Sequence, residues 1–148
     1  GARKEEIWNL SWREVDLKEG YLTFTDTKNK DIRSVPVIGQ ALELLREYHR
    51  KYRLLHTPLL FPSSQDPQKP LDLRKQWESA VRKAEIEDFR YHDLRHSAAS
   101  YMVRSGLDLR LVAEILGHRT LQMTMRYSHL QKDHLRQAMI KTIGGGNV

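Results

Sequence analysis

The residue types best suited to chemistry in this sequence are one tyrosine, two histidines and two arginines. Tyr127 lies in the segment Thr-Met-Arg-Tyr-Ser-His, downstream of His92-Asp-Leu-Arg95 and of Leu-Gly-His118, and Arg3 stands far upstream. Guanidinium groups bind phosphate oxygens in a forked geometry, imidazoles transfer protons, and an activated phenol can attack phosphorus. Together these residues indicate phosphoryl-transfer chemistry on a nucleic acid.

His92 and Arg95 are three residues apart, so on a helix they share one face. The lead-in Phe-Arg-Tyr91 places His92 near the start of that helix, where backbone amides and the helix dipole favour an anion. This geometry can hold one phosphate between the imidazole and the guanidinium. A histidine and an arginine satisfied locally on a helix surface would fit the spacing equally well.

His92 and His96 also have the four-residue spacing of a two-histidine zinc site on a helix. The metalloprotease version has Glu directly after the first histidine, and Asp93 occupies that position here. The sequence places no third ligand, although further histidines are present at His118, His129 and His134. We therefore expect no metal and no other cofactor.

A tyrosine phenol, with a pKa near 10, is a poor nucleophile unless it is activated. Positive charge from Arg3, Arg95 and a nearby lysine would stabilise the phenolate and the charge that builds on the phosphoryl oxygens. A lone tyrosine or a lone histidine past a helix end is more often structural. The functional interpretation depends on the whole set in this order.

The composition describes a globular protein with a polyanionic partner. The chain has 148 residues, with 25 Lys and Arg against 19 Asp and Glu, a formal charge of +6, and no cysteine. Such an excess of positive charge favours nucleic acid, and the absence of cysteine excludes disulfides and thiolate zinc sites. No apolar run approaches the ~20 residues of a membrane-spanning helix. We expect one domain over residues 1–148, located in the cytoplasm and associated with the nucleoid, with no membrane partner.

The periodicity of apolar residues predicts the elements that position these side chains. A short helix is expected over residues 3–12, followed by strands in which Val15, Leu22, Phe24 and Val35 alternate with polar residues. Turns at Glu19-Gly20 and at residues 28–31 would join three antiparallel strands, with Lys28 at the tip of the second hairpin.

From Gln40 the period becomes helical, with an apolar stripe over residues 41–55. A loop over 57–70 precedes a helix with Asp72 as its cap. Further helices are expected over 92–105 and over 132–143. Between them, one short helix would begin after Asp108 as its cap and end at Gly117, and another would begin after Thr120 as its cap. The predicted fold is mainly α with a small three-stranded antiparallel sheet, an α+β arrangement whose core comes from the stripes over 41–55, 73–84 and 94–116.

The order of these motifs resembles the tyrosine recombinase, or phage integrase, family. The resemblance rests on Arg3 within Gly-Ala-Arg-Lys-Glu-Glu, Lys28 in a hairpin, His92-x-x-Arg95, Leu-Gly-His118 and Tyr127, and it covers nearly the whole chain. It implies that double-stranded DNA is cut and rejoined without metal or high-energy cofactor. Tyr127 would attack the scissile phosphate and form a 3′-phosphotyrosyl link.

The resemblance also implies roles for the other residues. Arg3 and Arg95 would clamp the non-bridging oxygens, and His92 and His118 would hydrogen-bond the phosphate and assist proton transfer. Lys28 would protonate the leaving oxygen. Four further cations are expected to contact DNA, namely Lys30, Arg90, Arg119 and Arg126.

Partners and domain boundaries follow from the same resemblance. Family members carry a separate N-terminal DNA-clamping domain, so residues 1–148 would be an N-terminally truncated catalytic domain, with residues 144–148 as a flexible tail. Because the clamping domain would be missing, we expect the isolated fragment to be folded but to bind DNA weakly and to be impaired in activity. Other recombinase subunits would join it in a synaptic tetramer and exchange the helix at 131–143. Two alternatives stay open, a type IB topoisomerase and a DNA-binding or assembly module without turnover.

Overall fold

The computed structural model describes residues 1–25, 32–131, 139–140 and 142–143. The chain divides into two compact units, and each is described by itself. The amino-terminal unit is Arg3–Tyr91, and the carboxyl-terminal unit is His92–Val148 together with Gly1–Ala2. No helix in the described ranges is long and apolar enough to cross a membrane.

A three-stranded antiparallel sheet forms in the amino-terminal unit, as the alternating pattern predicts. Its strands are β1 (Val15–Asp16), β2 (Tyr21–Thr25) and β3 (Ile32–Pro36), in the order β1-β2-β3. Leu22 and Phe24 of β2 are buried, because a period of two sends both to the same face. The turn before β2 uses Gly20 at φ +73°, where a Cβ would lie 2.8 Å from the carbonyl oxygen of Val37. The predicted second turn, at residues 28–31, lies outside the described residues.

The first helix is shorter than the sequence indicates. Helix α1 spans Lys4–Trp8, and a 3-10 turn, η1 (Trp12–Glu14), follows with Ser11 as its cap. Backbone hydrogen bonds from Trp12 to Pro58 and from Leu60 to Leu10 tie the predicted loop over 57–70 to this segment. Leu60 is 1% exposed, so the loop contributes a core residue.

The helices α2 (Gln40–Tyr52) and α3 (Arg74–Lys83) form where the sequence predicts helices, but they contribute no buried residue. Leu44, Tyr52 and Leu55 on the predicted stripe of α2 are 57%, 60% and 90% exposed. The expectation that this stripe forms core is therefore wrong in the described structure, because amphipathic periodicity fixes a face of a helix but not what covers it. Asp72 accepts a hydrogen bond from the Arg74 amide. The N-cap residue of α3 is Leu73, so Asp72 lies one residue before the capping position that the sequence predicts for it.

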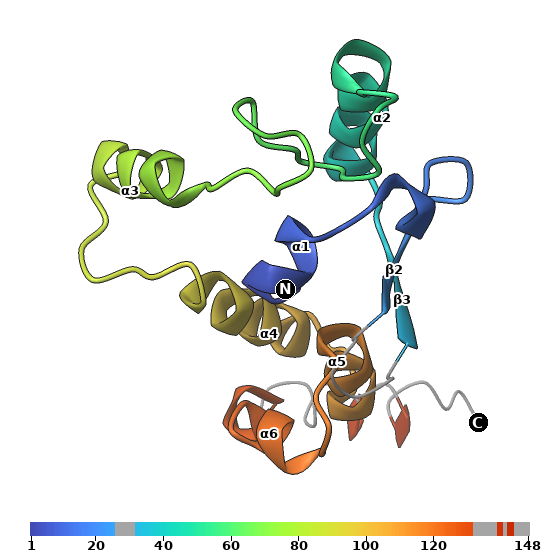
Figure 1. Cartoon of the computed structure of the whole chain (residues 1–148). Helices are drawn as coiled ribbons and strands as arrows, with labels where there is room; N and C mark the ends of the chain where they lie inside the picture. Colours follow the sequence, from blue (N-terminus) through green and yellow to red (C-terminus); the bar gives the residue numbers. More distant parts are fainter. Residues whose placement is uncertain (26–31, 132–138, 141, 144–148) are drawn as a thin grey trace. The chain divides into compact units, whose positions relative to one another are not determined.

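The carboxyl-terminal unit has a helical core that the sequence predicts well. Helices α4 (Asp93–Arg104), α5 (Leu109–Leu116) and α6 (Gln122–Met125) are followed by a 3-10 turn, η2 (Ser128–Gln131). Helix α4 packs against α5 and η2, and α5 packs against α6 (Figure 1). The side chains at the centre are fully or nearly fully buried: Ala99, Val103, Val112, Leu116 and Tyr127.

The ends of α5 follow from local sequence. Asp108 accepts a hydrogen bond from the Arg110 amide, and Gly117 ends the helix in the left-handed region at φ 66°. Thr120, in contrast, does not cap α6 through its side chain, since the helix has Leu121 at its N-cap position and no side-chain cap. Most of the predicted helix at 132–143, and the tail at 144–148, lie outside the described residues.

Candidate active site

Tyr127 lies between α6 and η2, with its ring in the core of the carboxyl-terminal unit and only 7% of the residue exposed. Its hydroxyl is 2.5 Å from Nδ1 of His96, on α4. The phenol that the sequence predicts to be reactive is therefore placed by a hydrogen bond as well as by packing.

The sequence did not identify His96 as part of a proton-transfer site. Its four-residue spacing from His92 suggested a zinc pair, and the structure instead sets the two rings edge to face with centroids 4.9 Å apart. Within the described part of the chain, no group of three or more His, Cys, Asp or Glu side chains is arranged to hold a metal ion. Apart from this spacing, nothing in the sequence indicated that His96 is functional, because its partner Tyr127 lies 31 residues away along the chain.

Burial and local charge keep this pair neutral near pH 7. Burial raises the pKa of the Tyr127 phenol, against the opposing effect of the positive charges on Arg126 and Arg95. Burial also lowers the pKa of His96, and electrostatic interactions with His92, Arg126 and Arg95 lower it further, while Asp93 opposes them. A protonated phenol thus faces a neutral imidazole.

Arg95 is 5% exposed, and its guanidinium is held at two points. Nη1 donates to the carbonyl oxygen of Gly1 at 2.7 Å, and Nη2 donates to that of Leu116 at 2.6 Å. The second bond fixes the arginine beside the end of α5, where the Leu-Gly-His118 segment begins. Arg95 is thus close enough to Tyr127 to affect its pKa and is also a structural anchor, a role that the sequence did not predict.

His118 follows the left-handed turn at Gly117, and its Nδ1 lies 2.7 Å from the hydroxyl oxygen of Thr124. Thr124 is fully buried on α6, and its backbone oxygen accepts a hydrogen bond from the Tyr127 amide. One residue therefore orients the His118 ring and fixes the backbone at the tyrosine. Sequence reasoning missed Thr124, since a threonine in a short helix carries no distinctive signal.

Arg3 belongs to the amino-terminal unit, where it precedes α1. Glu6 accepts hydrogen bonds from the Arg3 amide at 2.7 Å and from Arg3 Nη1 at 2.8 Å. Arg33 of β3 makes two more bonds to the same carboxylate, at 2.8 and 2.6 Å. Burial alone would raise the pKa of Glu6, but the bonds from Arg33 and Arg3 outweigh it and lower the pKa to about 2. Glu6 is thus a carboxylate shared by two arginines, and the sequence indicated it only as an acidic residue in a first helical turn.

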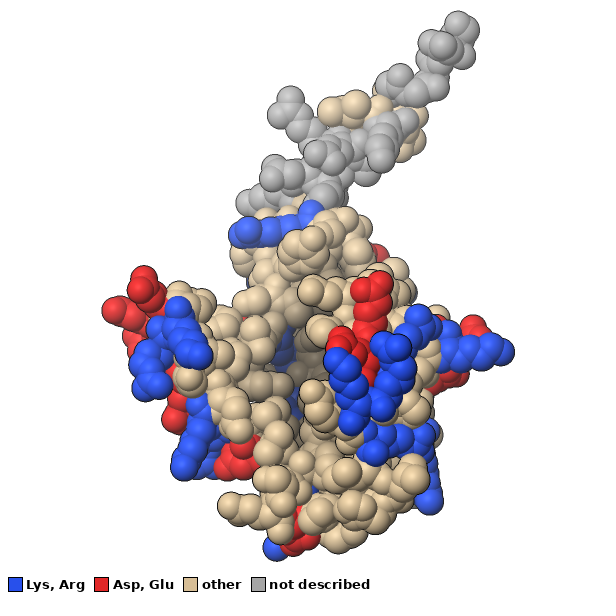
Figure 2. Space-filling view, turned by 90° about the horizontal axis from the view of Figure 1, so that it is seen from above, with Lys and Arg blue, Asp and Glu red and all other residues tan. Residues whose placement is uncertain are grey.

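The remaining predicted site residues are exposed cations or lie outside the described residues. Lys28 and Lys30 fall in the range 26–31, which the structure does not describe. Arg90, Arg119 and Arg126 are exposed. On the face shown in Figure 2, Lys and Arg side chains lie among Asp and Glu side chains rather than in one unbroken basic patch. The exposure of these three arginines is compatible with DNA contact, and DNA contact by them stays a prediction.

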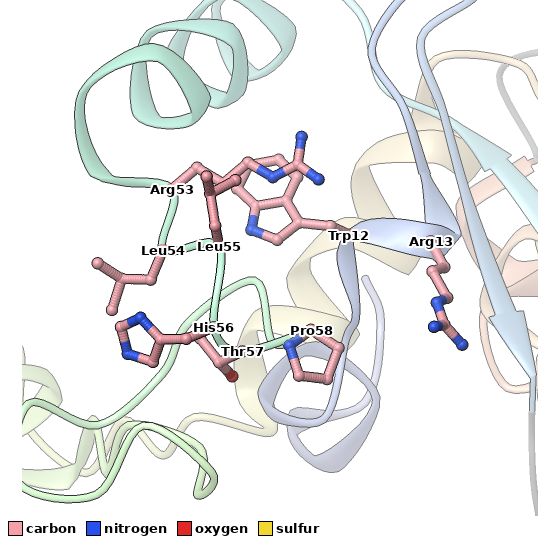
Figure 3. Close-up of a pocket in the computed structure, with 8 residues that line it drawn as sticks. All are labelled: Trp12, Arg13, Arg53, Leu54, Leu55, His56, Thr57 and Pro58. Atoms are coloured by element: carbon pink, nitrogen blue, oxygen red, sulfur yellow. The ribbon is translucent and has the colours of Figure 1, made fainter.

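The hollows elsewhere in the described part of the amino-terminal unit include one beside Trp12 and one beside α2. One, of about 530 Å³, is shown in Figure 3, where the Arg53 side chain lies along the indole of Trp12 and Arg13 points away from it. The other is an apolar groove of about 660 Å³ beside α2 that includes Leu44, Tyr48 and Phe61. None of the predicted site residues lines either hollow.

Known proteins share both the sequence and the fold. The sequence model of the phage integrase family matches residues 1–134. The tyrosine recombinase XerC of Xanthomonas axonopodis pv. citri is 36% identical, over 91% of this chain and 45% of that protein. The crystallised catalytic domain of bacteriophage HP1 integrase is 31% identical with a TM-score of 0.66, covering 93% of this chain and 72% of that one. A XerH site-specific recombinase bound to difH substrate gives a TM-score of 0.73 at 28% identity, over 93% of this chain and 42% of that one.

The chain therefore belongs to the phage integrase family. Its structural neighbours include a catalytic domain of that family, which confirms the predicted fold class. The chain spans about half the length, or less, of the curated relatives it matches. Their names, integrase and tyrosine recombinase, favour the recombinase interpretation over a type IB topoisomerase.

Proposed function

We propose that this chain is the catalytic domain of a site-specific DNA recombinase, which cuts and rejoins double-stranded DNA through a 3′-phosphotyrosyl intermediate. The observation that carries the proposal is the placement of Tyr127. Its phenol is held against an imidazole, close to the buried Arg95 guanidinium, in a chain that matches the phage integrase family over residues 1–134.

In this proposal the Tyr127 hydroxyl attacks the scissile phosphate in line with the 5′ oxygen of the next nucleotide. Arg3 and Arg95 bind the non-bridging oxygens and neutralise the charge that grows on them in the transition state. His92 and His118 hydrogen-bond the same phosphate. Lys28 protonates the 5′ oxygen as it leaves, and the reverse sequence rejoins the strand.

No metal or other cofactor is needed for these steps, since two arginines and two imidazoles supply the positive charge and the hydrogen bonds. The proposed partner is double-stranded DNA, supported by the XerH relative that is bound to difH substrate. Exposed Arg90, Arg119 and Arg126 are proposed to contact phosphates, and Lys30 is proposed with them. Such contacts position the protein on DNA without reading its sequence.

The finer assembly is also a proposal. Four subunits would join in a synaptic complex, each passing residues 131–143 to its neighbour, and the complex would act at the nucleoid. Sequence supports an amphipathic segment here, because Leu135, Met139, Ile140 and Ile143 repeat at helical spacing. Residues 132–138 and 141 within it lie outside the described residues.

The decisive experiment is covalent capture of DNA. A duplex with a nick close to the cleavage position loses its leaving strand after attack, so the protein–DNA adduct accumulates and can be counted on a denaturing gel. We expect an adduct with the wild type and none with Tyr127→Phe, which removes only the hydroxyl. Tyr101→Phe is the matched control, because this tyrosine is 74% exposed and lies away from the core. An adduct from Tyr127→Phe at the wild-type rate would refute the assignment.

A further inference from the structure

The steps proposed above give the His96 imidazole, which is hydrogen-bonded to the Tyr127 hydroxyl, no part in moving a proton. The Tyr127 hydroxyl carries a proton that must leave when its oxygen bonds to phosphorus. Nδ1 of His96, at 2.5 Å, is the ring nitrogen in contact with that oxygen in the described structure. The ring of His92 packs edge to face on the ring of His96, with centroids 4.9 Å apart.

We propose that His96 is the general base that receives the phenolic proton of Tyr127 as the phenol attacks the phosphate. This inference rests on the proposed function. The Oη–H bond breaks and its proton moves to the lone pair of Nδ1, while the Oη–P bond forms and the P–O5′ bond breaks. The 5′ oxygen takes its proton from Lys28. In rejoining, the His96 imidazolium returns the proton to Oη as the 5′ hydroxyl displaces it.

The packing of the carboxyl-terminal unit holds the Tyr127 hydroxyl and Nδ1 of His96 in place for the proton transfer. Tyr127 is 7% exposed and lies against the buried residues Ala99 and Val103 of α4, one turn and two turns along from His96. Helix α4 and the η2 turn that follows Tyr127 pack together. Both reacting atoms therefore sit on the rigid core of one unit. Such preorganisation is what efficient proton transfer within a hydrogen bond requires.

The surrounding charges favour a base that is neutral before the reaction. The charged and titratable groups that act on His96 are His92, Asp93 and Arg95 of its own segment and Arg126 beside Tyr127, and burial adds to their effect. Burial and the charges of His92, Arg126 and Arg95 lower the pKa of His96 and outweigh Asp93, which raises it, so the imidazole is neutral at pH 7. The proposal requires the neutral tautomer that carries its proton on Nε2, because only that tautomer has a lone pair on Nδ1. A phenolate formed next to Arg95 and Arg126 would also be stabilised by both cations.

The tautomer can be measured without DNA, by nitrogen NMR of the full chain labelled at histidine. His96→Asn identifies the His96 signals among those of the seven histidines by removing them. We expect an unprotonated Nδ1 and a protonated Nε2 at pH 7, with a shift of the Nδ1 signal in Tyr127→Phe. A proton on Nδ1 at pH 7 would overturn the proposal, because that nitrogen could then only donate to the phenol.

Adduct formation on the nicked duplex separates a base from a residue that only positions the tyrosine. His96→Asn places an amide oxygen near the position of Nδ1, so it preserves a hydrogen-bond acceptor but cannot take a proton. We expect the rate at pH 7 to fall by about 10²–10⁴-fold. The wild-type rate should rise with pH through a pKa below 6.5 and then level off, whereas the Asn variant should continue to rise into the alkaline range. His129→Asn, an exposed histidine two residues from Tyr127, is the matched control and should behave as the wild type.

A fluorinated tyrosine at position 127 provides the second readout, because its phenol ionises at lower pH and depends less on a base. The defect of His96→Asn should shrink on this background, and the alkaline rise of the Asn variant should move to lower pH. An Asn variant that matches the wild type in rate and pH profile would overturn the base assignment alone. A wild type that binds the nicked duplex but forms no adduct at any pH would overturn the proposed function, and this inference with it.

Discussion

In the amino-terminal unit, Glu6 is half-buried and stays ionised, whereas in the carboxyl-terminal unit the half-buried His96 and the buried Tyr127 stay neutral. Burial disfavours the charged form of all three groups. The difference comes from their partners. Glu6 has two arginines bonded to one carboxylate, while His96 has cations around it that oppose a further positive charge.

Because of this difference, Glu6 stabilises the fold as a permanent charge, whereas the His96–Tyr127 pair can transfer a proton. A carboxylate with a pKa of about 2 neither gives nor takes a proton near pH 7. A neutral imidazole bonded to a neutral phenol can do both, since only one proton has to shift within an existing hydrogen bond.

Arg3→Lys tests whether the Glu6 cluster serves chemistry as well as structure. Lysine preserves the positive charge and can still pair with Glu6, but it loses the planar fork that binds two oxygens of one phosphate. Cleavage of the nicked duplex should fall by about 10²–10³-fold, the typical loss when one transition-state donor is removed. DNA affinity, measured by anisotropy, should change little. If affinity and cleavage fell in equal proportion, Arg3 would be an ordinary binding residue.

Arg95→Lys should cause a large loss of stability in addition to a loss of cleavage, because Arg95 is a structural anchor as well as a proposed phosphate ligand. The Arg95 guanidinium donates to the carbonyl oxygens of Gly1 and Leu116 in a nearly closed site. A lysine cannot reach both, and each lost bond from a charged donor costs about 1.5–3 kcal/mol. We expect the free energy of unfolding in urea to fall by about 3 kcal/mol. A variant as stable as Arg3→Lys would show that the two carbonyl bonds contribute little.

Glu6→Gln tests the charged carboxylate through the pH dependence of stability. The folded pKa of about 2 lies below the unfolded value near 4.5, so the pairing stabilises the fold above pH 4.5 and is lost as the pH falls toward 2. The wild type should lose roughly 1–3 kcal/mol in this window once solvent screening is allowed for. Urea unfolding of Glu6→Gln from pH 5 to pH 2 should lack this component. Equal slopes for both proteins would contradict the assignment.

Thr124→Val should give the smallest effect. Valine has nearly the same shape but cannot bond to Nδ1 of His118, so the ring loses its orientation while the core stays filled. The lost hydrogen bond is worth about 0.5–1.5 kcal/mol. We expect cleavage to fall by about tenfold, with only a small decrease in the midpoint of urea unfolding. A fall in stability with normal cleavage would make Thr124 a core residue only.

Local sequence predicted those parts of the fold that depend on neighbouring residues. The alternation of Leu22 and Phe24, the cap at Asp108 and the left-handed end at Gly117 all depend on residues within a few positions, and all are confirmed. The candidate site was predicted as a set of residue types in order. Its internal bonds could not be, because His96–Tyr127 and Arg33–Glu6 join segments 31 and 27 residues apart.

The error at α2 has the same origin. Its apolar stripe was read correctly as a helical face, but periodicity cannot say whether another part of the chain covers that face. The buried apolar side chains described in the amino-terminal unit are instead Leu10, Leu22, Phe24 and Leu60. In the carboxyl-terminal unit, residues of α4 and α5 form the core together with Tyr127. A residue predicted as the nucleophile thus also serves as core.

The Glu6 carboxylate that Arg3 and Arg33 share connects two segments that lie far apart in the sequence. Arg33 is the second residue of β3, and its two bonds to Glu6 link that strand to the carboxylate that also binds Arg3. A displacement of β3 would therefore move the carboxylate that orients the Arg3 side chain, so the position of the strand and the direction of this arginine are coupled through one residue.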